Sequence, residues 1–174
     1  MINGFTVKNW KLRLARIPVE DSYRLDEKKE IAVVADGVTR DPLEKLPDKD
    51  TLAGKFLWAW HYPRPSSAKI VADAFCEQFI ELISSYRERS PEVVARGFEF
   101  GSSLINLLNE DYLSKADYLT RDLAGCVAAG IVTERDELSD VLHYGYICDS
   151  GVAIFDVNGN LVFRTENDGP DKHD

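Results

Sequence analysis

Two segments with the apolar spacing of helices lie in the middle of the chain, between two groups of strand-like segments. In residues 66–86 and again in residues 91–112, apolar side chains recur at steps of three and four. Ser66 and Ser67 can cap the first helix, and Pro91 suits the first turn of the second. Strands do not alternate strictly with helices, so this order predicts an α+β domain with helices packed on antiparallel sheets.

The first strand group contains a predicted hairpin. Residues 22–25 and 31–35 flank the charged stretch 26–30, which is typical of a turn. The segment 31–35, Ile-Ala-Val-Val-Ala, is apolar throughout, so we expect it to be buried on both faces and to stop at Asp36 and Gly37. Residues 5–16 also have a strand-like pattern.

The second strand group comprises residues 125–133, 141–148, 152–157 and 161–165. The last two segments are joined by Asn158-Gly159, a pair strongly favoured in two-residue hairpin turns. Between the strand groups, residues 38–65 contain several prolines, and we expect an irregular segment there. Its aromatic stretch, residues 56–62, is expected to be core or a packed surface loop, with a flap beside an active site as the alternative.

Size and charge limit the classes of partner. The 174 residues are enough for one domain, which we place at residues 1–174. Thirty acidic and 21 basic residues give a net charge of −9, which disfavours nucleic acid and anionic membranes as partners. The longest apolar runs are too short to span a bilayer. Three cysteines without C-x-x-C spacing are typical of reduced thiols, so a cytoplasmic location is expected.

Hairpin pairing predicts that carboxylates meet beside the apolar strand. If the first hairpin turns around residues 27 and 28, paired residue numbers sum to 56 or 57, and Asp36 lies opposite Glu20 or Asp21. Two carboxylates about 5 Å apart repel by about 3 kcal/mol at an effective dielectric constant of about 20. Such a pair needs a bound cation or a shared proton, and a hard divalent ion with oxygen ligands is the simplest occupant. The same arithmetic on the second hairpin sets Asp149 opposite Asp168.

Five short motifs, in order along the chain, resemble those of the metal-dependent Ser/Thr protein phosphatases of the PP2C (PPM) family. Residues 16–21 are similar to the family's R-x-x-N-E-D pattern, and residues 33–37 to its hydrophobic strand followed by D-G. Residues 124–127 are similar to its G-T-T-A segment, 148–150 to G-D-S-R and 165–168 to T-x-D-H. The resemblance implies a PP2C-like sandwich of antiparallel β-sheets flanked by α-helices.

The resemblance also implies a site for two Mn²⁺ or Mg²⁺ ions. Asp36 would bridge the ions, and Gly37 would offer its carbonyl oxygen. Glu20 and Asp21 would hold metal-bound waters, and Asp149 would match an aspartate associated with an additional metal. These positions together form the expected metal site.

The activity implied is hydrolysis of phosphoserine or phosphothreonine in a phosphoprotein substrate. Arg16 would bind the substrate phosphate through its planar set of donors. The nucleophile would be a water activated by the metals, so no side-chain nucleophile is required.

Several positions depart from the family pattern. Val19 stands in place of its asparagine, Val38 in place of a histidine proposed as general acid, and Gly151 in place of the G-D-S-R arginine. The S-D-G and D-N segments that carry two further aspartate ligands do not follow Asp168, so we expect the domain to be truncated at its C-terminus. A non-catalytic, pseudophosphatase-like module that binds phosphate or a regulatory partner is therefore the alternative function.

A second phosphatase type is less compatible with the sequence. Residues 36–39, Asp-Gly-Val-Thr, superficially resemble the D-x-D-x-T start of haloacid-dehalogenase-type enzymes. That chemistry needs an acid two residues after the first aspartate, and Val38 does not supply one. The missing alternation of strands and helices also argues against it.

Overall fold

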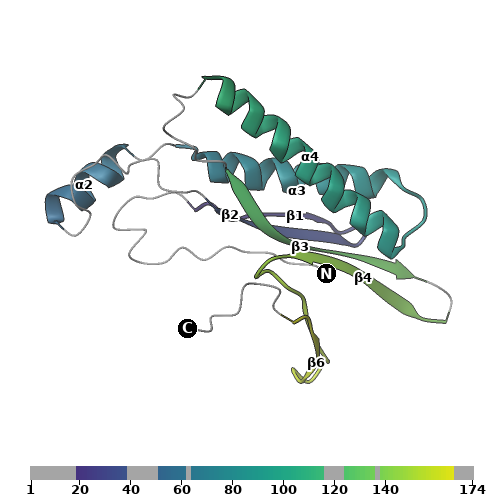
Figure 1. Ribbon diagram of the computed structural model, residues 1–174. Helices are drawn as coiled ribbons and strands as arrows, with labels where there is room; N and C mark the ends of the chain where they lie inside the picture. Colours follow the sequence, from purple (N-terminus) through teal and green to yellow (C-terminus); the bar gives the residue numbers. More distant parts are fainter. Residues whose placement is uncertain (1–18, 39–50, 62–63, 116–123, 136–137, 167–174) are drawn as a thin grey trace.

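The computed structural model describes residues 19–38, 51–61, 64–115, 124–135 and 138–166. Along the chain the elements are β1 (Ser22–Asp26), β2 (Ile31–Val38), α2 (Leu52–His61), α3 (Ser67–Ser85), α4 (Pro91–Lys115), β3 (Gly125–Arg135), β4 (Asp140–Ile147), β5 (Ala153–Phe155) and β6 (Leu161–Arg164). Strands β1-β2-β3-β4 form an antiparallel sheet in that order, and β5 pairs with β6. Helices α3 and α4 lie together on one face of the four-stranded sheet (Figure 1). The α+β class predicted from the sequence is confirmed.

Both central helices begin where the sequence predicts. The side chain of Ser66 accepts a hydrogen bond from the backbone N–H of Lys69 at 3.2 Å, which caps α3. Pro91 is the first residue of α4. At the other end of α3, the ammonium group of Lys29 donates to the carbonyl of Ser84 at 2.9 Å and so satisfies one of the last carbonyls of the helix.

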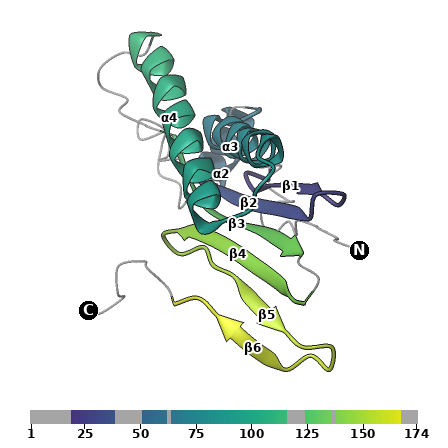
Figure 2. The ribbon, with the colours of Figure 1, turned by 90° about the vertical axis from the view of Figure 1, so that its right-hand side faces the viewer.

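The hydrophobic core lies between the two helices and the sheet. Figure 2 shows α3 and α4 packed above the sheet, seen from a second direction. The rings of Phe75, Phe79 and Phe98 lie 5.4–6.2 Å apart at its centre. A Cβ at Gly130 on β3 would lie 2.5 Å from the ring of Phe79, so the sheet has a glycine where this ring lies against it. The buried residues are Ile31, Val33, Ala35, Ala72, Phe75, Cys76, Phe79, Ile83, Val93, Val94, Ala128 and Val132.

The first hairpin has the predicted turn and one of the two predicted registers. Ser22 pairs with Ala35, and the sum of 57 continues through the ladder. Asp26 closes the turn by accepting hydrogen bonds from the backbone N–H groups of Lys28 and Lys29, both at 3.1 Å.

Two expectations for strand β2 were wrong. Its side chains alternate between the helix side and the opposite side, and Val34 on the opposite side is 50 % exposed, so the strand is not buried on both faces. The strand also continues through Asp36 and Gly37 to Val38, since all three remain paired with β3. The residues of β2 that face away from the helices therefore form part of an open, largely apolar sheet face.

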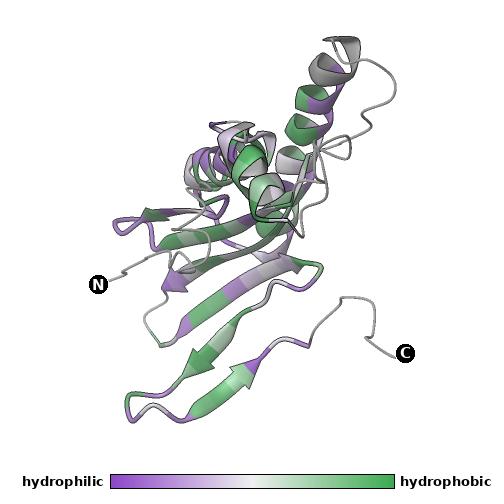
Figure 3. Cartoon of the chain, turned by 90° about the vertical axis from the view of Figure 1, so that its left-hand side faces the viewer, coloured by the Kyte–Doolittle hydropathy of each residue, from purple (hydrophilic) through white to green (hydrophobic). Residues whose placement is uncertain are grey.

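The second hairpin also has the predicted turn. Ala153 pairs with Arg164, and Gly159 takes a positive φ of 84° in the turn. The hairpin lies on the side of the sheet away from the helices, and its strands are hydrophobic over much of their length (Figure 3). Its contact with the sheet includes the rings of Tyr144 and Phe163, whose centroids are 5.3 Å apart.

Helix α2 replaces the irregular loop expected around the aromatic stretch. The backbone N–H of Gly54 donates to the side chain of Thr51 at 3.0 Å, as in a helix cap. The helix contacts none of the other described helices and strands, and Phe56 and Trp60 are 67 % and 72 % exposed. The expectation of a core or packed segment is therefore wrong for these two rings. Among the described helices, none is both long and apolar enough to cross a membrane.

Candidate functional site

Three aspartates lie at one end of the four-stranded sheet. Asp21 immediately precedes β1, Asp36 lies near the end of β2, and Asp149 follows β4 by two residues. In an antiparallel sheet the start of β1 and the ends of β2 and β4 meet at the same end. Continuing the hairpin register one step beyond Ser22 and Ala35 sets Asp21 opposite Asp36, which is one of the two pairings that the sequence predicts.

The electrostatics of Asp36 show that these acids lie close together. Partial burial, a hydrogen bond with Asp21, and the charges of Asp21, Asp149 and Glu20 raise the pKa of Asp36 from 3.8 to about 6. A hydrogen bond between two carboxyl groups requires a proton on one of them. At neutral pH the pair has lost this proton, so the cluster attracts cations most strongly there.

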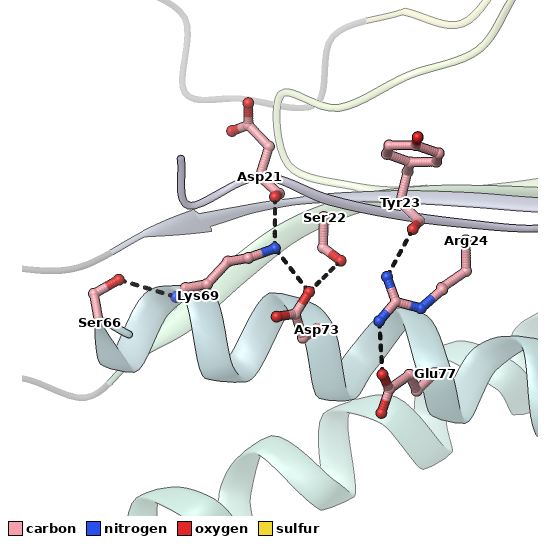
Figure 4. A network of polar contacts seen from close by, with 8 residues as sticks. All are labelled: Asp21, Ser22, Tyr23, Arg24, Ser66, Lys69, Asp73 and Glu77. Atoms are coloured by element: carbon pink, nitrogen blue, oxygen red, sulfur yellow. Dashed lines mark hydrogen bonds and ion pairs between the residues drawn. The ribbon is translucent and has the colours of Figure 1, made fainter. Parts of the chain in front are cut away.

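Asp21 and Asp36 share the sheet face that is turned away from α3. The next residue, Ser22, is buried on the helix side, where its hydroxyl donates to Asp73 at 2.7 Å. Successive side chains of an extended chain point to opposite faces, and the carboxylate of Asp21 points away from α3 (Figure 4). On β2, Asp36 is exposed on the same open face as Val34.

A polar network on the helix side holds the start of β1. The ammonium group of Lys69 donates to the backbone carbonyl of Asp21 at 3.0 Å and to Asp73 at 2.8 Å (Figure 4). Burial opposes ionisation of Asp73, but hydrogen bonds from Lys69 and Ser22 outweigh it and lower the pKa of this carboxyl. Further along β1, Arg24 pairs with Glu77 at 2.6 Å.

Gly37 is required by the close approach of α3. A Cβ at this position would lie 2.5 Å from the backbone oxygen of Ala68, in the first turn of the helix. The sequence predicted that the strand stops at Asp36 and Gly37, but the structure continues it through Gly37, which packs against the helix. The glycine therefore sets the distance between the helix and the strand beside Asp36.

The segment that carries Asp149 is held by Thr165. The hydroxyl of Thr165 accepts a hydrogen bond from the backbone N–H of Val152 at 3.0 Å. A Cβ at Gly151 would lie 2.3 Å from this hydroxyl, so the two segments are in close contact. Cys148, just before Asp149, has a positive φ of 63°, which turns the chain at the end of β4.

The donor set suits one hydrated hard cation. In the described ranges, no three His, Cys, Asp or Glu side chains gather closely enough to hold a metal ion between them. The Asp21–Asp36 pair offers carboxylate oxygens, and Mg²⁺ commonly binds through one or two carboxylates while it keeps several waters. The residues present therefore fit a single hydrated ion at this pair. Arg16 and Asp168 lie outside the described residues.

Comparison of the chain with protein-family models, with curated proteins and with solved structures finds no match. Support for the candidate site therefore comes from the residues of this chain and their arrangement.

Sequence reasoning found the acidic residues but missed those that hold them. Lys69 and Asp73 have the i, i+4 spacing of a helical ion pair, which was a usable pattern. Their contacts with Asp21 and Ser22 span about fifty positions of sequence, and no local pattern indicates such contacts.

Proposed function

We propose that this domain is a metal-dependent phosphoprotein phosphatase of PP2C type that uses Mn²⁺ or Mg²⁺ at the Asp21–Asp36 pair. The observation that carries the proposal is the strand register, which sets Asp21 opposite Asp36 at the end of the sheet where Asp149 follows β4. Burial and the neighbouring acids raise the pKa of Asp36, in keeping with this placement. A cluster of this kind is costly in the ionised state unless a cation neutralises it. The order of the sequence motifs then supplies the reaction class.

Each residue of the site would have a distinct role. Asp36 and Asp21 would hold the ion on the open face of the sheet, and the carbonyl of Gly37 would add an oxygen ligand. Glu20 and Asp149 would orient waters around it, and Arg16 would bind the substrate phosphate. When bound, a divalent ion supplies an acidified water as nucleophile and neutralises charge on the phosphoryl oxygens.

The fold supports part of the family resemblance. Helices cover one face of the antiparallel sheet, and the other face carries half-exposed apolar side chains such as Val34 and Tyr144. A second β-sheet stacked on that face, as in a PP2C-like sandwich, would bury them.

The direct test is hydrolysis of p-nitrophenyl phosphate and of a phosphothreonine peptide with Mn²⁺, with Mg²⁺ and with EDTA. We expect turnover that requires the metal and is lost in Asp36→Asn. Asp140→Asn is the matched control, because Asp140 is an exposed aspartate at the opposite end of the sheet. Metal-dependent turnover that survives Asp36→Asn would contradict the assignment of the site.

A non-catalytic module that binds a metal ion and a phosphorylated partner is the second candidate. It is favoured by the departures from the family pattern, with Val38 in place of the proposed general acid and Gly151 in place of the G-D-S-R arginine. Mn²⁺ binding that requires Asp36, without hydrolysis of either substrate, is the result that this function predicts.

A further inference from the structure

Two ion pairs lie where strand β1 meets helix α3: one joins the strand to the helix, and the other lies within the helix and also contacts the candidate site. Arg24 pairs with Glu77 at 2.6 Å, and Lys69 pairs with Asp73 at 2.8 Å. Figure 4 shows both pairs on the same side of the strand. The Lys69 ammonium also donates to the backbone carbonyl of Asp21 at 3.0 Å, whereas the second bond of the Arg24 guanidinium goes to the carbonyl of Tyr23 at 3.1 Å.

Asp21 lies one residue outside the β1–β2 ladder. The pairing of the two strands begins at Ser22 and Ala35. The backbone of Asp21 is instead held by the Lys69 ammonium at its carbonyl and by the adjoining Ser22 hydroxyl, which donates to Asp73. Lys69 thus provides a hydrogen bond to the Asp21 carbonyl just outside the ladder.

The first turn of α3 also contacts the partner of Asp21. Ala68, directly before Lys69, packs so closely on Gly37 that a Cβ there would lie 2.5 Å from the Ala68 oxygen. Gly37 directly follows Asp36. Consecutive residues of one helical turn therefore contact the backbone at or beside each member of the carboxylate pair.

We propose that Lys69 is a positioning residue for the candidate metal site: from behind the sheet, its ammonium group fixes the backbone of Asp21 so that the Asp21 carboxylate faces Asp36. This inference rests on the proposed metal site. Lys69 touches neither the ion nor a substrate in this arrangement, and it acts through Asp21.

The proposal predicts a change in affinity for a divalent cation that is opposite in sign to the change expected from electrostatics alone. Removing a positive charge near the acidic cluster would, by Coulomb's law alone, strengthen the binding of a divalent cation. If Lys69 positions Asp21, its removal weakens cation binding instead. Loss of a residue that orients a metal ligand typically lowers metal affinity by about tenfold or more. The sign of the change in affinity therefore separates the two explanations.

The experiment is calorimetric titration of Mn²⁺ into the full chain and into five variants at pH 7.5. Lys69→Met and Lys69→Gln remove the ammonium group, Lys69→Arg keeps the charge and a donor, and Asp36→Asn removes the proposed ligand. Arg24→Met is the matched control, since it removes one positive charge and one β1–α3 ion pair away from Asp21. Urea unfolding of each variant verifies that it is folded.

We expect about tenfold weaker binding in Lys69→Met and Lys69→Gln, restored affinity in Lys69→Arg, and unchanged or tighter binding in Arg24→Met. Lys69→Met and Lys69→Gln that bind as tightly as Arg24→Met, while Asp36→Asn binds weakly, would overturn the positioning role alone. If one Lys69 variant does not fold, the other decides. Mn²⁺ binding that is absent from the unaltered chain, or unaffected by Asp36→Asn, would overturn the proposed site and the inference together.

Discussion

Asp36 keeps its proton to a higher pH than an ordinary aspartate, because it is partly buried and lies among Asp21, Asp149 and Glu20. The register of the first hairpin brings it opposite Asp21, and the alternation of side chains places both on the open face of the sheet. The pairing of the two aspartates and their shared sheet face both follow from strand geometry once the position of the turn is known. The sequence could therefore predict this pair as one of two, since the charged turn limits the pairing to registers in which Asp36 lies opposite Glu20 or Asp21.

The raised pKa makes the metal-free protein less stable as the pH rises. Below about pH 4, Asp36 is neutral in the folded and unfolded states. Between 3.8 and about 6 only the folded state keeps the proton, so this stabilising contribution is lost as the pH rises through about 6. We expect Asp36→Asn to stabilise the metal-free protein by about 1 kcal/mol at pH 7.5, a value reduced for solvent screening.

Urea unfolding of the two proteins at pH 4, 6 and 7.5, with EDTA present, measures this difference. The gain from Asp36→Asn should grow between pH 4 and pH 7.5. A gain that is the same at every pH, or no gain at all, would show that the cluster does not raise the pKa of Asp36.

Metal binding at the same carboxyl should compete with its proton. Because a metal ligand must be deprotonated, we expect the affinity for Mn²⁺ to fall as the pH drops below about 6, with proton release on binding. Calorimetry at pH 5.5 in two buffers of different ionisation enthalpy measures the number of protons released. Equal heats in the two buffers would contradict displacement of the Asp36 proton.

At the scale of elements, the close contact between α3 and β2 should be sensitive to a single methyl group. Gly37→Ala places its Cβ against the backbone of Ala68, which cannot rotate away as a side chain could. We expect a loss of about 1–3 kcal/mol in the free energy of unfolding. Gly125→Ala is the control, since a Cβ there meets nothing within 4 Å, and its cost should stay below that of Gly37→Ala. Urea unfolding of both variants that gives equal losses would contradict this contact.

Helix α2 should contribute little to the stability of the rest of the fold. It contacts no other described element, and a helix of ten residues is marginal without tertiary contacts. We expect Trp60→Ala to change the free energy of unfolding by less than about 0.5 kcal/mol. Ile83→Val, in the core, should cost about 0.5–1.5 kcal/mol. A larger loss for Trp60→Ala than for Ile83→Val in urea unfolding would show that α2 is packed.

Sequence patterns predicted the caps and turns that depend on neighbouring residues. They failed where an element depends on a contact with a residue far away in the sequence. Ser66, Pro91 and Asn158-Gly159 act within a few residues, so the caps and the turn could be predicted. The strand through Gly37 could not, because the reason for that glycine is a helix thirty positions later. Helix α2 was not predicted, because the prolines on both sides of it are typical of irregular segments.

For the whole molecule, the cluster of Asp21, Asp36 and Asp149 brings together the two halves of the chain. Strands β1 and β2 supply Asp21 and Asp36, and the segment after β4, held by Thr165, supplies Asp149. Among the described helices, α3 and α4 cover one face of the sheet, and Asp21 and Asp36 lie on the other. With a net charge of −9, the protein favours a cation over an anion in its surroundings.

Electron paramagnetic resonance of Mn²⁺ mixed with the protein tests the proposed cation site most directly. The spectrum of free Mn²⁺ loses intensity when the ion binds, so it reports the bound fraction without any assumption about activity. At pH 7.5 we expect loss of the free-ion spectrum with the unaltered chain and with Asp140→Asn, and recovery of that spectrum with Asp36→Asn and with Asp21→Asn. Bound fractions that are equal in all four proteins would contradict a metal site at the Asp21–Asp36 pair.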